Sequence, residues 1–175
     1  LRHFSKVFDY IRLDHFRGFE AYYTIPYGNK TAIDGAWVKG PGMKLFNQVF
    51  KELKDINLIA EDLGFLTKEV YELLRETKLP GMKIMEFGFD VYGDSDHAPH
   101  NYKQHMVAYP GTHDNDTIKG WYDALDDTTK NYVKDYLNVQ DDLTIVDDFI
   151  KTIFASSADL VIVQLQDHLG LDNSA

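Results

Sequence analysis

The chain has 175 residues, of which 44% are hydrophobic, so it is long enough to form a domain with a buried core. Acidic residues outnumber basic ones by 28 to 18, and the formal net charge of −10 argues against a nucleic-acid partner. The sequence has no cysteine, which excludes disulfides and thiolate chemistry and is compatible with the cytoplasmic location that we expect. No apolar run approaches the roughly 20 residues of a membrane span, and we expect no membrane partner.

The first predicted element is a strand that begins at Tyr10 and gives way to a turn at Gly18. Alternation places Arg12 and Asp14 on one face of this strand and its apolar side chains on the other. An arginine two residues before a carboxylate favours the ionised carboxylate, as a nucleophile requires. A structural Arg12–Asp14 pair on a sheet surface is the alternative interpretation.

The next part of the chain alternates loops, helices and short apolar strands. Residues 20–42 are rich in proline and glycine, and we predict a long loop there, of the kind that forms lids and binding loops. The spacing of apolar residues predicts a helix over 45–53, and residues 57–64 are typical of a short buried strand. Thr67 is the predicted N-cap of a second helix.

The rest of the chain continues the same alternation of strand, loop and helix. The predicted elements are a strand at 82–87, a loop at 90–103, a strand at 104–109, helices near 118–125, 130–137 and 145–154, a strand at 160–165 and a loop at 166–170. Near-continuous apolar strands in this order predict an α/β fold with a parallel sheet covered by helices.

Two architectures have a parallel sheet of this kind. An open doubly wound sheet usually carries a glycine-rich phosphate-binding turn, and neither a G-x-G-x-x-G motif nor a P-loop occurs here. We therefore predict a partial (β/α)8 TIM barrel, consisting of roughly the last five strands with their helices.

Three predicted strand ends carry an acidic residue, namely Asp14, Glu61 and Asp114. In a barrel these ends converge on one face, and two carboxylates that flank a bond are the apparatus of glycoside cleavage. The apolar residues before Glu61 favour its neutral, proton-donating form, whereas Arg12 favours an ionised Asp14. The sequence thus predicts Asp14 as nucleophile, Glu61 as general acid/base and Asp114, beside His113, as a group that orients sugar hydroxyls. For each acid, a helix cap or a solvated surface position is the alternative.

Several of these stretches resemble motifs of one enzyme family. Ile11–Phe19, Ile59–Gly64 and Gly111–Asn115 resemble three successive motifs of the amylomaltase family, also called 4-α-glucanotransferase or disproportionating enzyme, within the α-amylase superfamily. Residues 25–42 and 79–83 are similar to two further signatures of that family. The resemblance covers essentially the whole chain.

The resemblance implies retaining transfer of α-1,4-glucan segments to glucose or maltooligosaccharide acceptors. Asp14 matches the nucleophile that carries the covalent intermediate, Glu61 the residue that acts first as acid and then as base, and Asp114 the transition-state stabiliser. Arg12 and His113 match groups around the donor sugar. No metal or organic cofactor is implied, and α-1,4-glucans and maltooligosaccharides are the implied partners.

Aromatic residues of the predicted loop are candidates for stacking on the acceptor sugar. They are Tyr22, Tyr23, Tyr27 and Trp37, and an equally good interpretation makes them loop anchors. Tyr23 stands where family members often carry tryptophan, which alters one aromatic contact.

Members of the resembled family are far longer than this chain. They supply three earlier barrel strands, a helical insertion and further residues near the C-terminus. We therefore expect residues 1–175 to be a fragment of a single catalytic barrel domain, with little or no transferase activity by itself. Unpaired sheet edges in such a fragment favour self-association.

Three other functions remain open from the sequence. A hydrolase of the same superfamily shares the chemistry, and a non-catalytic glucan-binding module shares the fold. A metal site formed by residues of the second loop is the third, with Asp94, Asp96, His97 and His100 as its ligands.

Overall fold

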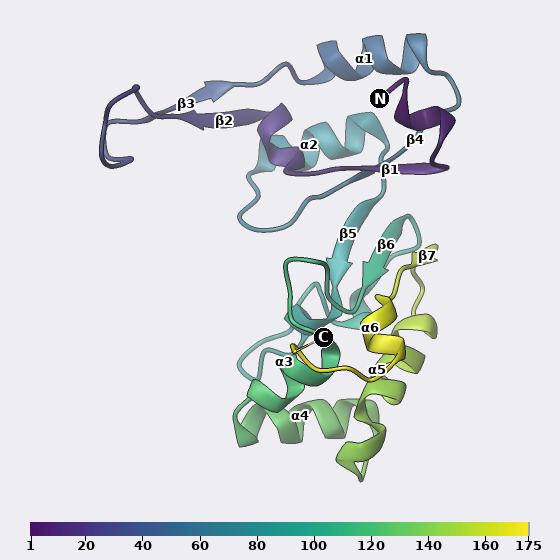
Figure 1. Ribbon diagram of the computed structural model, residues 1–175. Helices are drawn as coiled ribbons and strands as arrows, with labels where there is room; N and C mark the ends of the chain where they lie inside the picture. The colour runs from purple at the N-terminus through teal and green to yellow at the C-terminus, as the bar shows by residue number, and fades with distance from the viewer. Residues whose placement is uncertain (175) are drawn as a thin grey trace. The chain divides into compact units, whose positions relative to one another are not determined.

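The computed structural model describes residues 1–174, which form two compact units, Leu1–Gly81 and the residues from Met82 onward (Figure 1). The first unit contains two parallel strands, β1 (Tyr10–Leu13) and β4 (Asn57–Ala60). Helices α1 (Met43–Glu52) and α2 (Lys68–Thr77) pack against them. The buried side chains between these elements are Phe16, Phe46, Leu58, Ala60, Val70, Leu73 and Leu79.

Two single turns of 3₁₀ helix complete the first unit, η1 (Phe4–Lys6) before β1 and η2 (Phe16–Phe19) after it. The η2 turn contributes Phe16, which is fully buried against Phe46 of α1, with ring centroids 5.6 Å apart. This contact fixes the chain immediately after the candidate nucleophile on the core of the unit.

The prediction of a structureless loop over 20–42 is wrong, because most of this segment is a β-hairpin. Strands β2 (Ala21–Thr24) and β3 (Ala36–Lys39) pair antiparallel and extend away from α1 and α2 (Figure 1). The sequence pattern does not predict these strands, because β3 is exposed along its whole length and β2 along half of it. Neither strand therefore has an alternating apolar face. Tyr23 lies directly opposite Trp37 in the register.

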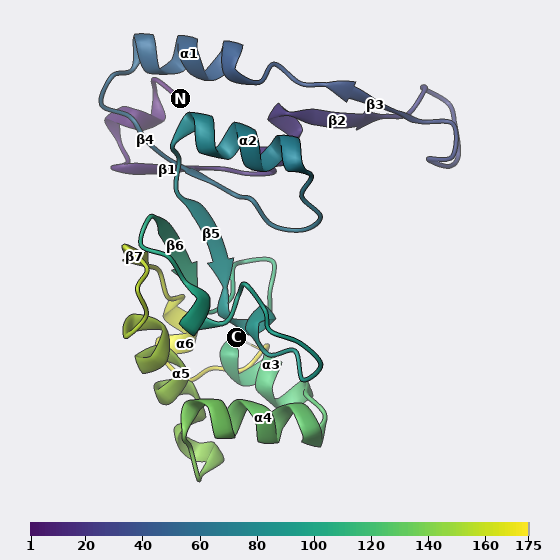
Figure 2. The ribbon, with the colours of Figure 1, turned by 180° about the vertical axis from the view of Figure 1, so that it is seen from behind.

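The second unit contains a three-stranded sheet in the order β5-β6-β7. The strands are β5 (Gly81–Ile84), β6 (Met106–Tyr109) and β7 (Leu160–Val161), and β6 and β7 run parallel. Its helices are α3 (Ile118–Ala124), α4 (Asp127–Leu137), α5 (Ile145–Phe154) and α6 (Leu165–His168), which Figure 2 shows from behind. Phe149 of α5, Ile118 of α3 and Val133 of α4 are fully buried in the core that these helices share.

Several strand boundaries differ from the prediction. The third predicted strand ends at Ile84, and Met85–Gly88 forms the 3₁₀ turn η3. The last strand ends at Val161, and helix α6 replaces the expected loop. Two smaller 3₁₀ turns, η4 (Pro99–Asn101) and η5 (Asp142–Thr144), lie in connecting segments. The predicted α/β class with parallel strands is confirmed, whereas the partial barrel remains a prediction.

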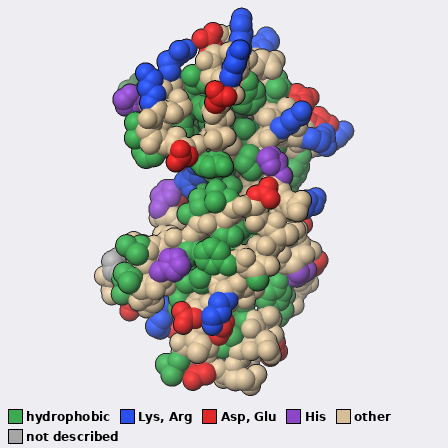
Figure 3. Space-filling view, turned by 90° about the vertical axis from the view of Figure 1, so that its right-hand side faces the viewer, with side chains coloured by type: hydrophobic (Ala, Val, Ile, Leu, Met, Phe, Trp, Pro, Cys, Tyr) green, Lys and Arg blue, Asp and Glu red, His purple; other side chains and the backbone are tan. Residues whose placement is uncertain are grey.

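Large hydrophobic side chains are exposed on both units. Examples are Phe8 and Tyr10 in the first unit and Tyr92 and Leu143 in the second. Figure 3 shows hydrophobic surface among charged side chains on one face. None of the helices described over residues 1–174 has the length and apolar character needed to cross a membrane.

Candidate active site

Asp14 and Glu61 lie at the same end of two paired strands. β1 and β4 run parallel with Leu13 opposite Ala60, so the next residue on each strand is one of the two acids. The Glu61 N–H donates to the Leu13 carbonyl oxygen over 2.9 Å, which continues the ladder by one step. Both carboxylates therefore begin at the carboxyl edge of the same strand pair.

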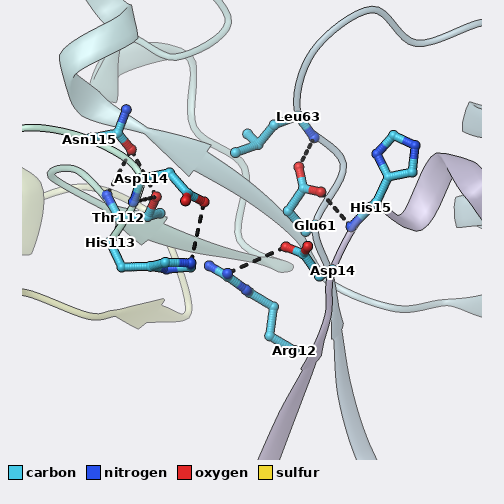
Figure 4. A network of polar contacts seen from close by, with 9 residues as sticks. All are labelled: Arg12, Asp14, His15, Glu61, Leu63, Thr112, His113, Asp114 and Asn115. Atoms are coloured by element: carbon cyan, nitrogen blue, oxygen red, sulfur yellow. Dashed lines mark hydrogen bonds and ion pairs between the residues drawn. The ribbon is translucent and has the colours of Figure 1, made fainter.

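The carboxylate of Glu61 is held by two backbone donors, drawn in Figure 4. Its Oε2 accepts the His15 N–H over 2.7 Å, and its Oε1 accepts the Leu63 N–H over 2.9 Å. His15 has a left-handed backbone, with φ of 49°, at the position that makes this bond. The half-buried carboxylate is thus in a more polar setting than the apolar residues before it predict, and its orientation is fixed.

Arg12 and Asp14 form the ion pair that their spacing predicts. The guanidinium Nη2 lies 3.5 Å from Asp14 Oδ1. The Arg12 side chain is 23% exposed, whereas that of Asp14 is 76% exposed and open to an incoming molecule. At such exposure the pair adds little stability, so its main effect is to orient the Asp14 carboxylate.

Asp114 lies in the second unit, in a segment after β6 that we call the Asp114 segment (Gly111–Asn115). Asn115 Oδ1 accepts hydrogen bonds from the backbone N–H and the hydroxyl of Thr112, at 2.9 and 2.8 Å (Figure 4). The Gln164 amide donates to the Thr112 carbonyl oxygen over 3.1 Å. Thr112 is consequently buried and fixed, while His113 and Asp114 are exposed.

His113 and Asp114 are close enough to interact, with Nε2 and Oδ2 3.4 Å apart. The structure thus gathers the predicted site residues in two groups. Arg12, Asp14 and Glu61 meet in the first unit, and His113 and Asp114 meet in the second.

Tyr23 and Trp37 form an aromatic pair on the β2–β3 hairpin. Their ring centroids are 5.4 Å apart in an edge-to-face arrangement, and the Tyr23 hydroxyl donates to the Ala32 carbonyl oxygen. Gly35 makes room for the pair, because a Cβ there would lie 2.2 Å from Tyr23 Cε1. Tyr23 is 41% exposed and Trp37 is 55% exposed, so the pair offers ring surface to solvent.

Arg17 contacts the Tyr23–Trp37 pair as well, and no sequence pattern predicted this contact. Its Cζ lies 4.2 Å from the centre of the Trp37 ring, and its Nη1 donates to the Phe65 carbonyl oxygen. A guanidinium over an indole face is a cation–π contact. Arg17 therefore fixes the ring plane of Trp37 and connects the hairpin to the segment after β4.

Glu86 in the second unit is a titratable group that the sequence did not single out. It lies two residues after the end of β5, and the predicted strand at 82–87 hid this position because it placed Glu86 inside a strand. Glu86 is 6% exposed, and burial together with the charges of Asp167 and Asp116 raises its pKa to about 8. Asp167 is also buried, and burial raises its pKa as well.

The alternative metal site does not form. His100 Nε2 lies 3.1 Å from Asp94 Oδ1, but His97 Nδ1 accepts the backbone N–H of Ile84 instead. Burial lowers the pKa of His97 to about 4. Over residues 1–174 there is no group of three or more histidines and acids that could hold a metal ion.

Comparison with known proteins places the chain in a family. Residues 1–175 match the family model described as 4-alpha-glucanotransferase. The chain is 48% identical over 176 residues to the 4-alpha-glucanotransferase of Streptococcus pneumoniae and 42% identical to that of Arabidopsis thaliana, chloroplastic/amyloplastic. These alignments cover 100% of this chain but 35% and 30% of the two relatives.

A solved structure gives the same result. The amylomaltase from Streptococcus agalactiae in complex with acarbose matches with a TM-score of 0.92 and 39% identity, over 98% of this chain and 35% of that one. The chain thus spans about a third of the length of the relatives that it matches. It belongs to the 4-alpha-glucanotransferase family.

Proposed function

We propose that this chain supplies the catalytic groups of a 4-α-glucanotransferase that acts on α-1,4-glucans and maltooligosaccharides. In this proposal Asp14 is the nucleophile, Glu61 the general acid/base and Asp114 the transition-state stabiliser, with Arg12 and His113 around the donor sugar. The register of β1 and β4 carries the proposal, because it starts Asp14 and Glu61 from neighbouring positions at one sheet edge.

The reaction is a double displacement. The Asp14 carboxylate attacks the anomeric carbon and forms a covalent glucosyl-enzyme, while Glu61 protonates the departing glycosidic oxygen. Glu61, now a carboxylate, then takes the proton from the 4-hydroxyl of an acceptor sugar, which attacks the same carbon and releases Asp14. Asp114 stabilises the positive charge that develops on the sugar ring in each step.

Transfer requires that an acceptor sugar reach the intermediate before water does. The exposed rings of Tyr23 and Trp37 offer an apolar platform for such a sugar, and Arg17 holds the Trp37 ring in place. The family description, 4-alpha-glucanotransferase, and the solved amylomaltase in complex with acarbose support an α-glucan as the class of substrate.

The proposed architecture is part of a single (β/α)8 barrel domain. The parallel pairs β1–β4 and β6–β7 support it, as does the match to an amylomaltase that is longer than this chain. No cofactor takes part in the proposed reaction. A cytoplasmic location, compatible with the cysteine-free sequence, belongs to the same proposal.

A hybrid enzyme tests the function. These 175 residues replace the matching 176 residues of the Streptococcus pneumoniae relative, and the hybrid is incubated with maltotriose. We expect a ladder of longer maltooligosaccharides together with glucose, whereas the 175-residue chain alone gives little or no ladder. Release of glucose and maltose without longer products would instead support a hydrolase.

Variants of the hybrid test the roles of the acids. Asp14→Asn, Glu61→Gln and Asp114→Asn should each lower kcat by at least about 10³-fold, because each removes a group needed in the transition state. Glu76→Gln, at an exposed position of α2, is the matched control and should retain full activity.

Trapping the intermediate separates an enzyme from a binding module. Fluoride leaves without protonation, so the Glu61→Gln hybrid should react with α-maltosyl fluoride and then stall as a glycosyl-enzyme. Mass spectrometry of peptides should find the sugar on Asp14. Binding of maltooligosaccharides with no covalent adduct in any variant would support the non-catalytic module.

A further inference from the structure

A buried carboxyl group that the proposed mechanism does not use lies at the end of β5. Glu86 belongs to the η3 turn, and its backbone N–H donates to the Pro110 carbonyl oxygen over 3.1 Å. The side chain is 6% exposed, and its Oε1 is buried without a hydrogen-bond partner. Burying a carboxyl oxygen without a hydrogen bond lowers the stability of the fold, above all when the group is ionised.

The Glu86 carboxyl packs against the Asp114 segment. A Cβ at Gly111 would lie 2.8 Å from Glu86 Oε1, which is closer than such atoms approach in proteins. Gly111 and Thr112 are buried, whereas the next two residues of the segment, His113 and Asp114, are exposed. The carboxyl group thus supports the buried start of the segment whose exposed part carries the candidate acid.

Two carboxylates face Glu86 from other elements, Asp167 on α6 and Asp116 just before α3. The η3 turn itself and residues 110–112 packed on it contain no other titratable side chain. Asp167 is 1% exposed, and its Oδ1 accepts the Ile118 N–H over 2.8 Å while its Oδ2 has no partner. Burial is the largest effect on Asp167 and raises its pKa, while this hydrogen bond and, to a smaller degree, His168 act in the opposite direction and favour the ionised form.

Glu86 has no comparable donor and therefore holds its proton at neutral pH. Burial is the largest cause that raises its pKa to about 8, and the charges of Asp167 and Asp116 add to it. A neutral acid at this position is also less costly to leave without a hydrogen bond than a carboxylate would be.

We propose that Glu86 is a positioning residue, whose buried carboxyl group holds the Asp114 segment, and with it His113 and Asp114, in the conformation needed for transfer. The inference rests on the proposed function for its effect on catalysis. Loss of the Glu86 proton adds a negative charge that faces Asp167 and Asp116. Repulsion between these carboxylates then displaces the Asp114 segment from the Glu86 side chain. Transfer should consequently fail in alkaline solution through the position of Asp114.

The first test measures protonation and position without any activity. The 175-residue chain is labelled with ¹³C at glutamate side-chain carboxyls and with ¹⁵N, and it is titrated by NMR. We expect one carboxyl signal with a midpoint near pH 8 that is absent in Glu86→Gln, and amide signals of Gly111–Asn115 that shift with the same midpoint. A Glu86 signal that titrates near its ordinary value, or amide signals that stay fixed, would overturn the proposal.

The second test follows kcat of the hybrid enzyme with pH. With a midpoint near pH 8, about nine-tenths of the Glu86 groups are ionised at pH 9, so kcat should fall about tenfold between pH 7 and pH 9. In Glu86→Gln, which cannot ionise, the fall should be less than about twofold. Asp135→Asn removes an exposed carboxylate from the same unit and should keep the alkaline fall of the parent.

A pair of substitutions tests the contact itself. Gly111→Ala introduces a Cβ against Glu86 Oε1 and should lower kcat, and adding Glu86→Ala should restore part of the loss because it removes the clashing atoms. Additive losses would contradict the proposed contact. If the NMR result holds but no variant of the hybrid transfers glucan, the proposed function fails and the role of Glu86 in holding the segment stands.

Discussion

At the scale of single residues, backbone N–H groups hold the carboxylate of the candidate general acid/base, Glu61. His15 adopts a left-handed conformation, which costs a residue with a side chain roughly 1–2 kcal/mol. Its N–H bonds the Glu61 carboxylate, and a hydrogen bond to a charged group contributes about 1.5–3 kcal/mol. The contact with Glu61 therefore offsets the strain at His15.

A buried histidine near β5 makes stability depend on pH. Burial lowers the pKa of His97 to about 4 from its usual 6.5, so between these pH values the unfolded chain binds a proton that the folded chain does not. Stability should therefore fall as the pH falls through this range. We expect His97→Asn, whose amide oxygen can accept the Ile84 N–H, to lose less stability than the parent between pH 7 and pH 5.

Urea denaturation of the chain at both pH values measures this difference. His3→Asn, at an exposed position, is the control and should behave like the parent. Equal losses in the parent and in His97→Asn would mean that another group causes the acid sensitivity.

The candidate acids could be predicted from the sequence, because a strand end is a local feature. Asp14 and Glu61 each follow a short apolar run, and the structure has a strand end at both positions. The groups that hold them could not be predicted in the same way. The bond from His15 to Glu61 joins residues 46 positions apart, and the packing of Glu86 on Gly111 depends on two strands meeting in a sheet.

At the scale of elements, helices with an apolar face were predictable and the exposed hairpin was not. The spacing that predicts α1, α2 and α5 reflects burial of one face, which the structure confirms. The β2–β3 hairpin buries little, so its pairing depends on cross-strand contacts such as Tyr23 with Trp37. Such a pair joins residues that are not neighbours in sequence, and no local pattern reveals it.

Helix α5 supplies a test of how the second unit is stabilised. Phe149 is fully buried, with its ring 5.7 Å from Phe89 and 5.4 Å from Trp121 between centroids. Phe149→Ala should lower the free energy of unfolding by about 3–5 kcal/mol, because it removes buried surface and leaves a cavity.

Urea denaturation followed by circular dichroism measures this loss. Phe154 lies on the same helix but is 55% exposed, and Phe154→Ala should cost far less. Equal losses at both positions would contradict the assignment of Phe149 to the core.

At the scale of the whole molecule, each of the two units has its own buried cluster and one part of the predicted site. In the described chain β1 pairs with β4 alone, so one edge of β1 has no neighbouring strand. An unpaired strand edge can add a strand from a second molecule. This is the physical basis for the expected self-association.

We expect the 175-residue chain to form dimers or larger species in sedimentation velocity runs. The fraction of the chain in these species should rise with its concentration. Tyr10→Lys places a charge at the exposed start of β1 and should shift the distribution towards monomer. Tyr27→Lys introduces the same charge in the hairpin loop and should not. A parent chain that sediments as a monomer at every concentration would contradict the expectation.

The cation–π contact of Arg17 with Trp37 has a practical consequence. The chain has two tryptophans, and the other one, Trp121, packs on the core of the second unit. Indole emission responds to solvent and to nearby charge, so the two residues provide separate intrinsic fluorescence signals. Trp37 reports binding of a molecule to the hairpin, and Trp121 reports whether the core of the second unit is intact. Neither measurement needs an attached dye.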